Sequence, residues 1–199
     1  DNRFLIGYFS GTSSHQDDFE LIQESVIAFL KKHPDAALVL GGHFALDTDL
    51  HDLLKAGSLI PLPAVDYITL QYLQASVDAV LAPLVIDNFT NCKSGLKVFE
   101  AGLVGTPACA SKSFAYAEAI DDGSSGHICK TREDWANALE ELHNNKLTRA
   151  TMSQHARDIA LDRYYGARVR NCFESLCEKL SKTPISEISP SVEESLDAH

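Results

Sequence analysis

Residues 93–107 read Lys-Ser-Gly-Leu-Lys-Val-Phe-Glu-Ala-Gly-Leu-Val-Gly-Thr-Pro. The apolar residues from Gly95 to Val104 predict a largely buried helix, and the run from Pro107 to Ala110 predicts a buried strand. A helix that leads directly into a continuous apolar strand is typical of parallel α/β sheets, in which both faces of each strand are covered.

The same alternation extends to both sides of this stretch. Strands are predicted at 4–9, 36–40, 58–62, 77–82 and 127–129, and helices at 17–33, 67–75, 131–142, 147–164 and 167–180. Apolar strands that alternate with amphipathic helices predict an α/β fold with a Rossmann-like, doubly wound parallel sheet. The chain ends in helices without further strands, so we expect C-terminal helices beside this sheet.

Length and charge narrow the class of protein. The chain has 199 residues and a mass of 21.8 kDa, enough to bury the core of one domain without crosslinks. A net charge of −11 disfavours binding to nucleic acids or anionic lipids. Residues 183–199 hold four acidic residues, no Lys or Arg, and two prolines. We therefore expect one domain over residues 1–181 and an acidic, disordered tail over residues 182–199.

The compartment is predicted from what the sequence lacks. No apolar run approaches the ~20 residues of a membrane-spanning helix, and no signal peptide precedes the first strand. The five cysteines are an odd number without C-x-x-C spacing, and Cys109 lies within an apolar strand. These features favour a reducing, cytoplasmic location and a core role for Cys109.

Three segments that follow strands, or begin helices, are candidate ligand sites, because ligands bind at the carboxyl edge of parallel sheets. Residues 10–15 include Gly11 and Thr12, but match no phosphate-loop motif, and taken alone they are better explained as a solvated turn between a strand and a helix. Residues 62–63 offer backbone groups to a planar base. Residues 91–97 place Lys93 and Lys97 around the start of a helix, where a phosphate would meet two ammonium groups and the helix dipole.

Glu100 follows Lys97 at a spacing of three residues, so the two can form a surface ion pair worth about 0.3 kcal/mol. The helix is largely apolar, however, and charged side chains at its strand-end rim have few structural uses. We therefore favour a binding role for both.

Metal sites are not indicated. Asp47-Thr48-Asp49, together with His51 and Asp52, is interpreted as a solvated loop rather than a metal site. The eight histidines show no zinc-binding spacing. We expect no metal and no other cofactor.

The segment 93–107 resembles the group 1 glycosyltransferases, whose donor-binding C-terminal domain carries a Glu-Ala-x-x-x-Gly-x-Pro signature. It is matched here by Glu100, Ala101, Gly105 and Pro107. Further matches follow in order over residues 116–126, at the Trp135 helix and near residues 164–165. The opening Gly7–Thr12 is similar to the start of that domain in a bacterial subgroup associated with surface-polysaccharide assembly.

The resemblance implies one half of a GT-B fold and a retaining, metal-independent transfer from a nucleotide-diphosphate sugar. Glu100 matches the glutamate that hydrogen-bonds the donor ribose, and Ser94, Gly95 and Leu96 match the amides that hold the diphosphate. Leu62 and Pro63 fall where the backbone recognises the base, by analogy a uracil or related pyrimidine, and Gly11 and Thr12 complete the donor-binding set. Lys93 and Lys97 are the catalytic candidates, because they would stabilise the charge on the departing nucleoside diphosphate.

Two positions depart from the family pattern. The sugar-contacting glutamate is replaced by Cys92, and the Arg and Lys that usually follow the first strand are absent from Ser10 to Asp17. Lys93 and Lys97 are candidates to replace that positive charge. A GT-B enzyme also has two Rossmann-like domains, so we expect an N-terminal acceptor-binding domain in a longer parent chain or in a partner subunit. Any peripheral association with the inner face of a membrane would occur through that half.

Two functions remain open. The first is the donor-binding domain of a glycosyltransferase (EC 2.4 class, hexosyl-type) that acts on a glycan or lipid-linked acceptor and is inactive alone. The second is a degenerate, non-catalytic module within a polysaccharide-assembly protein, which Cys92 favours and the retained Glu100 and lysines disfavour. An epimerase of similar fold would need acid and base residues that the sequence does not reveal.

Overall fold

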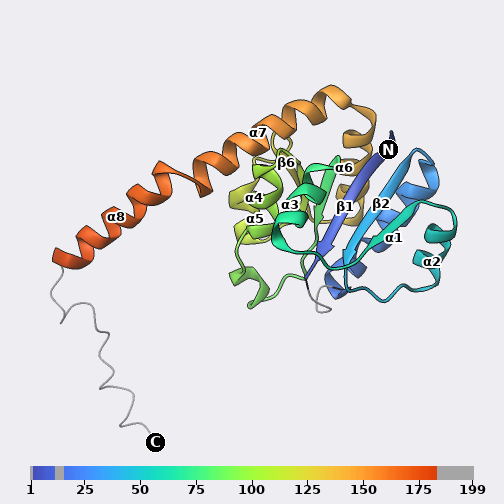
Figure 1. The fold of residues 1–199 in the computed structure, drawn as a ribbon, viewed down its shortest axis with the longest axis horizontal. Coiled ribbons are helices and arrows are strands. Elements are labelled where there is room, and N and C mark those ends of the chain that lie inside the picture. The colour runs from blue at the N-terminus through green and yellow to red at the C-terminus, as the bar shows by residue number, and fades with distance from the viewer. Residues whose placement is uncertain (1, 12–15, 183–199) are drawn as a thin grey trace, which may run out of the picture. The chain divides into compact units, whose positions relative to one another are not determined.

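The computed structural model describes residues 2–11 and 16–182, which fall into two units, Asp1–Leu161 and Asp162–His199. The first unit is built on a six-stranded sheet with helices on both faces (Figure 1). All strand pairs in the sheet are parallel, in the order β3-β2-β1-β4-β5-β6. This order confirms the predicted Rossmann-like α/β fold. The strands are β1 (Phe4–Ser10), β2 (Ala36–Gly42), β3 (Leu59–Leu62), β4 (Ala79–Ala82), β5 (Ala108–Ser111) and β6 (Gly126–Cys129).

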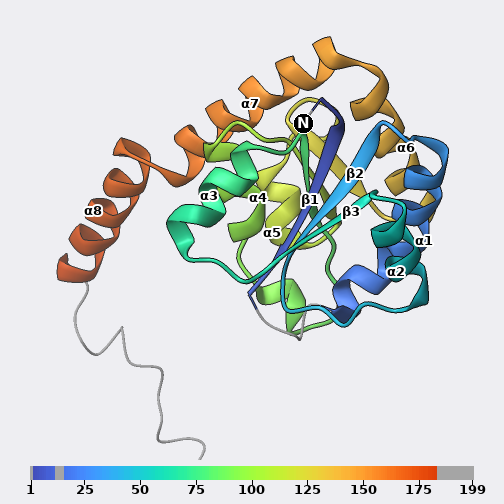
Figure 2. The ribbon, with the colours of Figure 1, turned by 45° about the vertical axis from the view of Figure 1, so that its right-hand side comes forward.

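Helices cover both faces of the sheet (Figure 2). They are α1 (Gln16–Lys32), α2 (Thr48–Lys55), α3 (Tyr67–Ala75), α4 (Leu96–Leu103), α5 (Phe114–Ala119), α6 (Arg132–Asn144) and α7 (Lys146–Tyr164), with a short 3₁₀ turn, η2 (Thr90–Cys92), before α4. The second unit contains α8 (Ala167–Lys182).

The core divides because side chains alternate across each strand. On one face, Ile6 and Tyr8 of β1 pack with Phe19 and Ile22 of α1 and with the apolar side of α6. On the other face, Phe9 packs with residues of β2, β4 and α4, and is joined by Leu70 and Leu73 of α3. Both faces of β1 are therefore buried, as the unbroken apolar run predicted.

Two glycines in the segment 93–107 are required by the local structure. Gly105 has φ +78° directly after α4, a left-handed conformation that ends a helix at little cost only for glycine. Gly102 faces α7 so closely that a Cβ there would lie 2.8 Å from the carbonyl oxygen of Ala156. The segment thus encodes a close helix contact at Gly102 and a sharp turn into β5 at Gly105.

One expectation about local structure was wrong, and the two helices α2 and α5 were not predicted. Asp47-Thr48-Asp49 is not a solvated loop, because it begins α2, with Asp47 Oδ1 accepting a hydrogen bond from the Leu50 amide at 2.9 Å. That bond lowers the pKa of Asp47, and the carboxylate acts as a helix cap. The short helix α5, which no sequence pattern predicted, begins in the same way at Ser113. Cys109 is fully buried in the core, as predicted.

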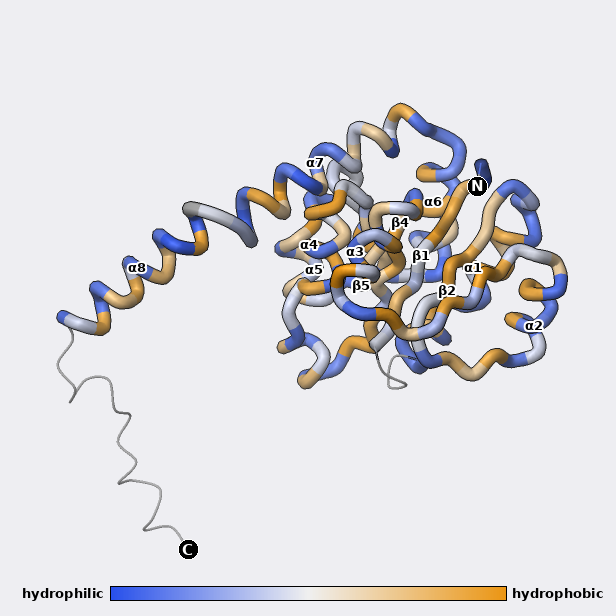
Figure 3. Tube along the Cα trace, viewed as in Figure 1, coloured by the Kyte–Doolittle hydropathy of each residue, from blue (hydrophilic) through white to orange (hydrophobic). Residues whose placement is uncertain are grey.

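The helix α8 has one apolar side that is exposed. Val169, Phe173, Leu176 and Leu180 recur at helical spacing, with 47–65 % of their surface accessible, and alternate with polar residues along the helix (Figure 3). Within residues 2–11 and 16–182, no helix combines the length and apolarity required to cross a bilayer.

Candidate functional site

The candidate site lies at the carboxyl edge of the sheet, around the ends of β1 and β4. The connections from these two neighbouring strands leave in opposite directions along the sheet, because β1 continues to β2 and β4 continues to β5. Such a switch point is where ligands bind in open α/β sheets. The loop after β1 and the segment between β4 and α4 contain most of the predicted site residues.

Lys97 brings a positive charge to this switch point. It lies in the first turn of α4, and its Nζ is 5.0 Å from the centroid of the Tyr8 ring in β1. Burial lowers the pKa of Lys97 to about 8, with the negative charge of Asp18 opposing this shift and the positive charge of Lys93 adding to it. An anion bound beside Lys97 would favour the charged ammonium.

Lys93 and Cys92 come from a loop that is held by its own hydrogen bonds. The Thr90 hydroxyl donates to the Val85 carbonyl at 2.5 Å, and the Thr90 amide donates to Asp87 Oδ1 at 2.6 Å. Cys92 is exposed, and its Sγ lies 3.3 Å from the Asn88 carbonyl oxygen. The half-buried Lys93 lies over the Phe89 ring, with Nζ 5.8 Å from the centroid. The loop therefore presents both side chains from a defined backbone.

The N-terminus of α4 is open to a ligand. Gly95 is the residue before the first turn, and no side chain among the described residues caps this end with a hydrogen bond. Its first amides are therefore available to an anion. Gly95 is itself buried, because a Cβ there would lie 3.2 Å from the Ala115 carbonyl oxygen of α5. Ser94 and Leu96 on either side are exposed.

Glu100 lies one turn further along α4 and is 7 % exposed. Burial raises the pKa of its carboxyl group, while a hydrogen bond from the Tyr67 hydroxyl of α3 works in the opposite direction. Glu100 in turn raises the pKa of Tyr67. Glu100 is thus not the surface ion-pair partner of Lys97 that its spacing allowed. It is a buried hydrogen-bond acceptor. Burying a carboxylate costs free energy of folding, which favours a functional role for Glu100.

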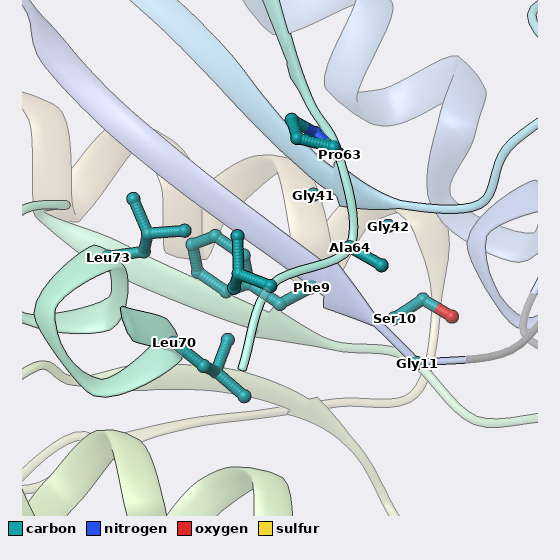
Figure 4. A pocket seen from close by; sticks show the side chains of 10 residues that line it. Phe9, Ser10, Gly11, Gly41, Gly42, Pro63, Ala64, Leu70 and Leu73 are labelled. Atoms are coloured by element: carbon teal, nitrogen blue, oxygen red, sulfur yellow. The ribbon is translucent and has the colours of Figure 1, made fainter. Parts of the chain in front are cut away.

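A small apolar pocket lies at the same edge of the sheet, at the ends of β1 and β2 (Figure 4). Phe9 from β1 and Leu70 and Leu73 from α3 form its apolar wall, and Pro63 and Ala64 border it from the segment after β3. The remaining lining residues are Ser10, Gly11, Gly41, Gly42 and Val65. Its volume is about 90 Å³, whereas pockets for drug-sized ligands measure about 300–1,000 Å³. It therefore has room for one small ring and not for a whole nucleotide.

The floor of this pocket depends on two glycines. A Cβ on Gly7 would lie 2.5 Å from Phe9 Cε2, and a Cβ on Gly41 would lie 2.8 Å from Phe9 Cδ1. Real Cβ atoms do not approach other atoms so closely, so the Phe9 ring can lie across β1 and β2 only because both positions lack side chains. Phe9 is itself 8 % exposed.

The structure brings some predicted residues together and leaves others apart. Gly11 and Pro63 line the same pocket, Leu62 ends β3 and packs into the core beside it, and Lys93 acts electrostatically on Lys97. Cys92 is exposed in η2, and its Sγ pairs with the Asn88 carbonyl oxygen of the same loop rather than with these groups. Thr12 lies outside the described residues.

Sequence reasoning missed three residues at this edge. Tyr8 lies beneath the Lys97 ammonium, Asp18 supplies the nearby negative charge, and Tyr67 hydrogen-bonds Glu100. Asp18 also accepts a hydrogen bond from the Val85 amide at 2.8 Å, which ties α1 to the start of the loop. All three belong to elements other than α4, so no local spacing links them to its charged residues.

Comparison with known families agrees with this geometry. The model for "Glycosyl transferases group 1" matches residues 3–145, which is more than half of the chain. The chain belongs to the group 1 glycosyltransferases. As a group 1 glycosyltransferase sequence, it is 27 % identical over 181 residues to a D-inositol 3-phosphate glycosyltransferase of Corynebacterium kroppenstedtii, covering 83 % of this chain and 38 % of that protein. It is 28 % identical over 158 residues to the protein of the same name from an Arthrobacter species, covering 74 % and 36 %.

Solved glycosyltransferase structures share its fold. Anabaena HepE in complex with UDP superposes with a TM-score of 0.70 at 23 % identity, covering 92 % of this chain and 50 % of that one. The C-terminal domain of the group 1 protein LpcC from Francisella tularensis gives 0.64 at 22 % identity, covering 82 % and 87 %. The chain therefore spans about half the length of HepE, and less than two fifths of the two curated relatives.

Proposed function

We propose that this chain is the donor-binding, C-terminal half of a retaining, metal-independent glycosyltransferase of the hexosyl-transferring type, and that it binds a nucleoside-diphosphate sugar at the carboxyl edge of its sheet. The observation that carries the proposal is the convergence of the Lys97 ammonium, the open N-terminus of α4 and buried Glu100 at the β1/β4 switch point. The family assignment and the UDP or UDP-glucose in three HepE structures support it.

The three parts of the donor would meet three kinds of group. The pocket under residues 63–65 would hold the base, because it fits one ring and offers backbone groups beside apolar walls. Glu100 would accept hydrogen bonds from the ribose hydroxyls, since a buried carboxylate gains most from donors that replace water. Lys93, Lys97 and the first amides of α4 would surround the diphosphate.

These groups would also assist the departure of the nucleoside diphosphate. Negative charge grows on the diphosphate as the bond to the sugar breaks, and fixed cations and amides stabilise that charge without reorganising. No metal ion is needed for this role if two ammonium groups and a helix N-terminus supply the positive potential. The acceptor, a glycan or lipid-linked molecule, would be held by a second domain.

Titration calorimetry tests the binding step. We expect UDP and UDP-sugars to bind the 199-residue chain, and Glu100→Gln and Lys97→Met to weaken binding at least tenfold, which corresponds to about 1.4 kcal/mol. Lys31→Met, which removes an exposed lysine from the far end of α1, is the matched control and should bind as the wild type does. The absence of binding to every member of a panel of nucleoside diphosphates and nucleotide sugars would overturn the proposal. Unchanged binding in both site variants would also overturn it.

Cys92 favours a second candidate, a non-catalytic module of a polysaccharide-assembly protein that binds a nucleotide sugar without transferring it. An exposed thiol, rather than a glutamate, stands where the family contacts the sugar. The two candidates differ in turnover by the complete protein. A transferase is expected to release nucleoside diphosphate when the acceptor is supplied, and Lys97→Met should abolish that release, whereas a binding module releases none.

A further inference from the structure

A second group of polar side chains lies at the amino edge of the sheet, opposite the candidate donor site. His33 directly follows α1, Asp35 directly precedes β2, and His143 is in the last turn of α6. One ligand atom from each of these three residues lies within 4.8 Å of the other two. Among the residues that the structure describes, this is the one such group of His, Cys, Asp and Glu side chains.

The distances within the group are close to those between neighbouring ligands of a metal ion. His143 Nε2 is 3.1 Å from Asp35 Oδ2, and His33 Nε2 is 2.9 Å from Oε1 of Glu140. Zinc bonds of about 2.0–2.2 Å place neighbouring ligand atoms about 3–3.5 Å apart. His33, Asp35 and His143 are therefore close enough to share one ion, whereas Glu140 Oε1 also accepts a hydrogen bond from Lys32 Nζ at 2.7 Å.

The hydrogen bonds of Asn144 indicate which ring nitrogen of neutral His143 carries the proton and which carries the lone pair. The Asn144 amide group donates from Nδ2 to Glu140 Oε2 at 3.2 Å, so its Oδ1, 3.2 Å from His143 Nδ1, accepts from that ring nitrogen. In neutral His143, Nε2 then carries a lone pair, which faces the acceptor-only carboxylate of Asp35. Two acceptors at 3.1 Å require a cation between them, either a proton or a metal ion.

The two imidazoles are held rigidly. Their ring centroids are 4.2 Å apart, the His33 ring lies 4.6 Å from that of Phe29, and the His143 ring meets Phe4 edge-on at 5.4 Å. Each of the two histidine side chains is 13 % exposed. The Phe4 amide donates to the Asp35 carbonyl at 2.8 Å, which fixes the backbone between His33 and β2. Such a pair loses little freedom when it binds a ligand.

We propose that His33, Asp35 and His143 bind a zinc ion. Two imidazoles with a carboxylate suit zinc and related transition metals, whereas magnesium and calcium prefer oxygen ligands alone. The Asn144 bond to Nδ1 is the outer-shell contact that orients a metal-binding histidine. The ion would tie the ends of α1 and α6 to the start of β2, and so serve stability rather than transfer.

The test uses the full 199-residue chain after treatment with a chelator. We expect calorimetry to show one zinc ion bound per chain and no comparable binding of magnesium, and we expect zinc to raise the unfolding temperature. Asp35→Asn and His143→Asn should each weaken zinc binding at least tenfold and remove the thermal shift. His155→Asn, an exposed histidine on α7 bonded to Ser124, is the control and should bind zinc as the wild type does.

Two outcomes would overturn the inference. If the wild-type chain binds no zinc, then a proton occupies the gap between His143 and Asp35, and the group is a set of ion pairs. If Asp35→Asn and His143→Asn bind zinc as tightly as the wild type, then the metal is held elsewhere. Asp35→Asn keeps the test decisive should His143→Asn fail to fold, since the Asp35 side chain is 70 % exposed and nearly isosteric with its replacement.

Discussion

At the scale of single residues, the charge of Lys97 should control donor binding through pH. Its pKa is lowered to about 8, chiefly by burial, so the ammonium form dominates below pH 8 and is lost as the pH rises through that value. We expect affinity for UDP to fall between pH 7 and pH 9.5 by up to about 2 kcal/mol, the free energy required to keep a group with a pKa of about 8 protonated at pH 9.5. Lys97→Arg keeps its charge throughout and should flatten the profile. Equal declines in wild type and variant would contradict this assignment.

Gly41 should control the base pocket in a different way. In Gly41→Ala, the added Cβ would lie 2.8 Å from Phe9 Cδ1, so the ring must move away from β2 and into the pocket. We expect a severalfold loss of UDP affinity, measured by calorimetry, with a smaller loss for inorganic pyrophosphate, which lacks a base. An equal loss for both ligands would show that the change acts on the diphosphate site or on folding.

The sequence revealed the charged site residues that lie close together along the chain. Lys97 and Glu100 were recognised because a helix places residues three apart on one side, and Lys93 because it lies in the loop just before that helix. Tyr67 and Asp18 reach the same site from α3 and α1, and no spacing rule connects them. The same holds for Asp35 and His143, which are 108 positions apart, so eight scattered histidines gave no sign of a cluster.

At the scale of elements, the close contact between α4 and α7 should make glycine more stabilising than alanine at position 102, which is the reverse of the usual preference in helices. Alanine is favoured over glycine within helices by about 1 kcal/mol. In Gly102→Ala, however, the new Cβ would lie 2.8 Å from the Ala156 carbonyl oxygen and 3.1 Å from the Ala160 Cβ. We expect a net destabilisation of about 1–3 kcal/mol from overpacking, measured by denaturant unfolding. Ala150→Leu, on the exposed side of α7, should leave stability nearly unchanged; a gain in stability for Gly102→Ala would refute the close contact.

The predicted strands and helices match the observed bounds within two residues, whereas the short helices α2 and α5 were not predicted. The helix α3 runs from Tyr67 to Ala75 as expected, because its start and its end are both marked by the sequence. The helix α2 has only Leu50 and Leu53 as buried residues, and α5 is six residues long. Such helices are stabilised by a capping side chain and by tertiary packing rather than by propensity, so a charged or polar stretch conceals them.

At the scale of the whole molecule, the two sites lie at opposite edges of one sheet and should act independently. The donor groups lie beyond the carboxyl ends of β1 and β4, and His33, Asp35 and His143 lie beyond the amino ends of the strands. Residues far apart that share no partner usually contribute additively. We therefore expect chelation of zinc to lower the unfolding temperature without changing UDP affinity at a temperature where the chain remains folded. A parallel loss of UDP affinity would place the metal at the donor site.

The chain alone should bind a nucleotide sugar but not turn it over. Its charged groups can hold the donor, yet transfer also requires an acceptor placed against the sugar, and bringing two reactants together accounts for a large part of the barrier in such reactions. We expect chromatography to detect no multiple-turnover release of UDP from UDP-sugars by the 199 residues. A chimera that adds the acceptor-binding half of a group 1 glycosyltransferase should release UDP when its acceptor is present, and Lys97→Met in that chimera should not. Sustained transfer by the 199-residue chain alone would contradict the assignment of this chain to the donor half.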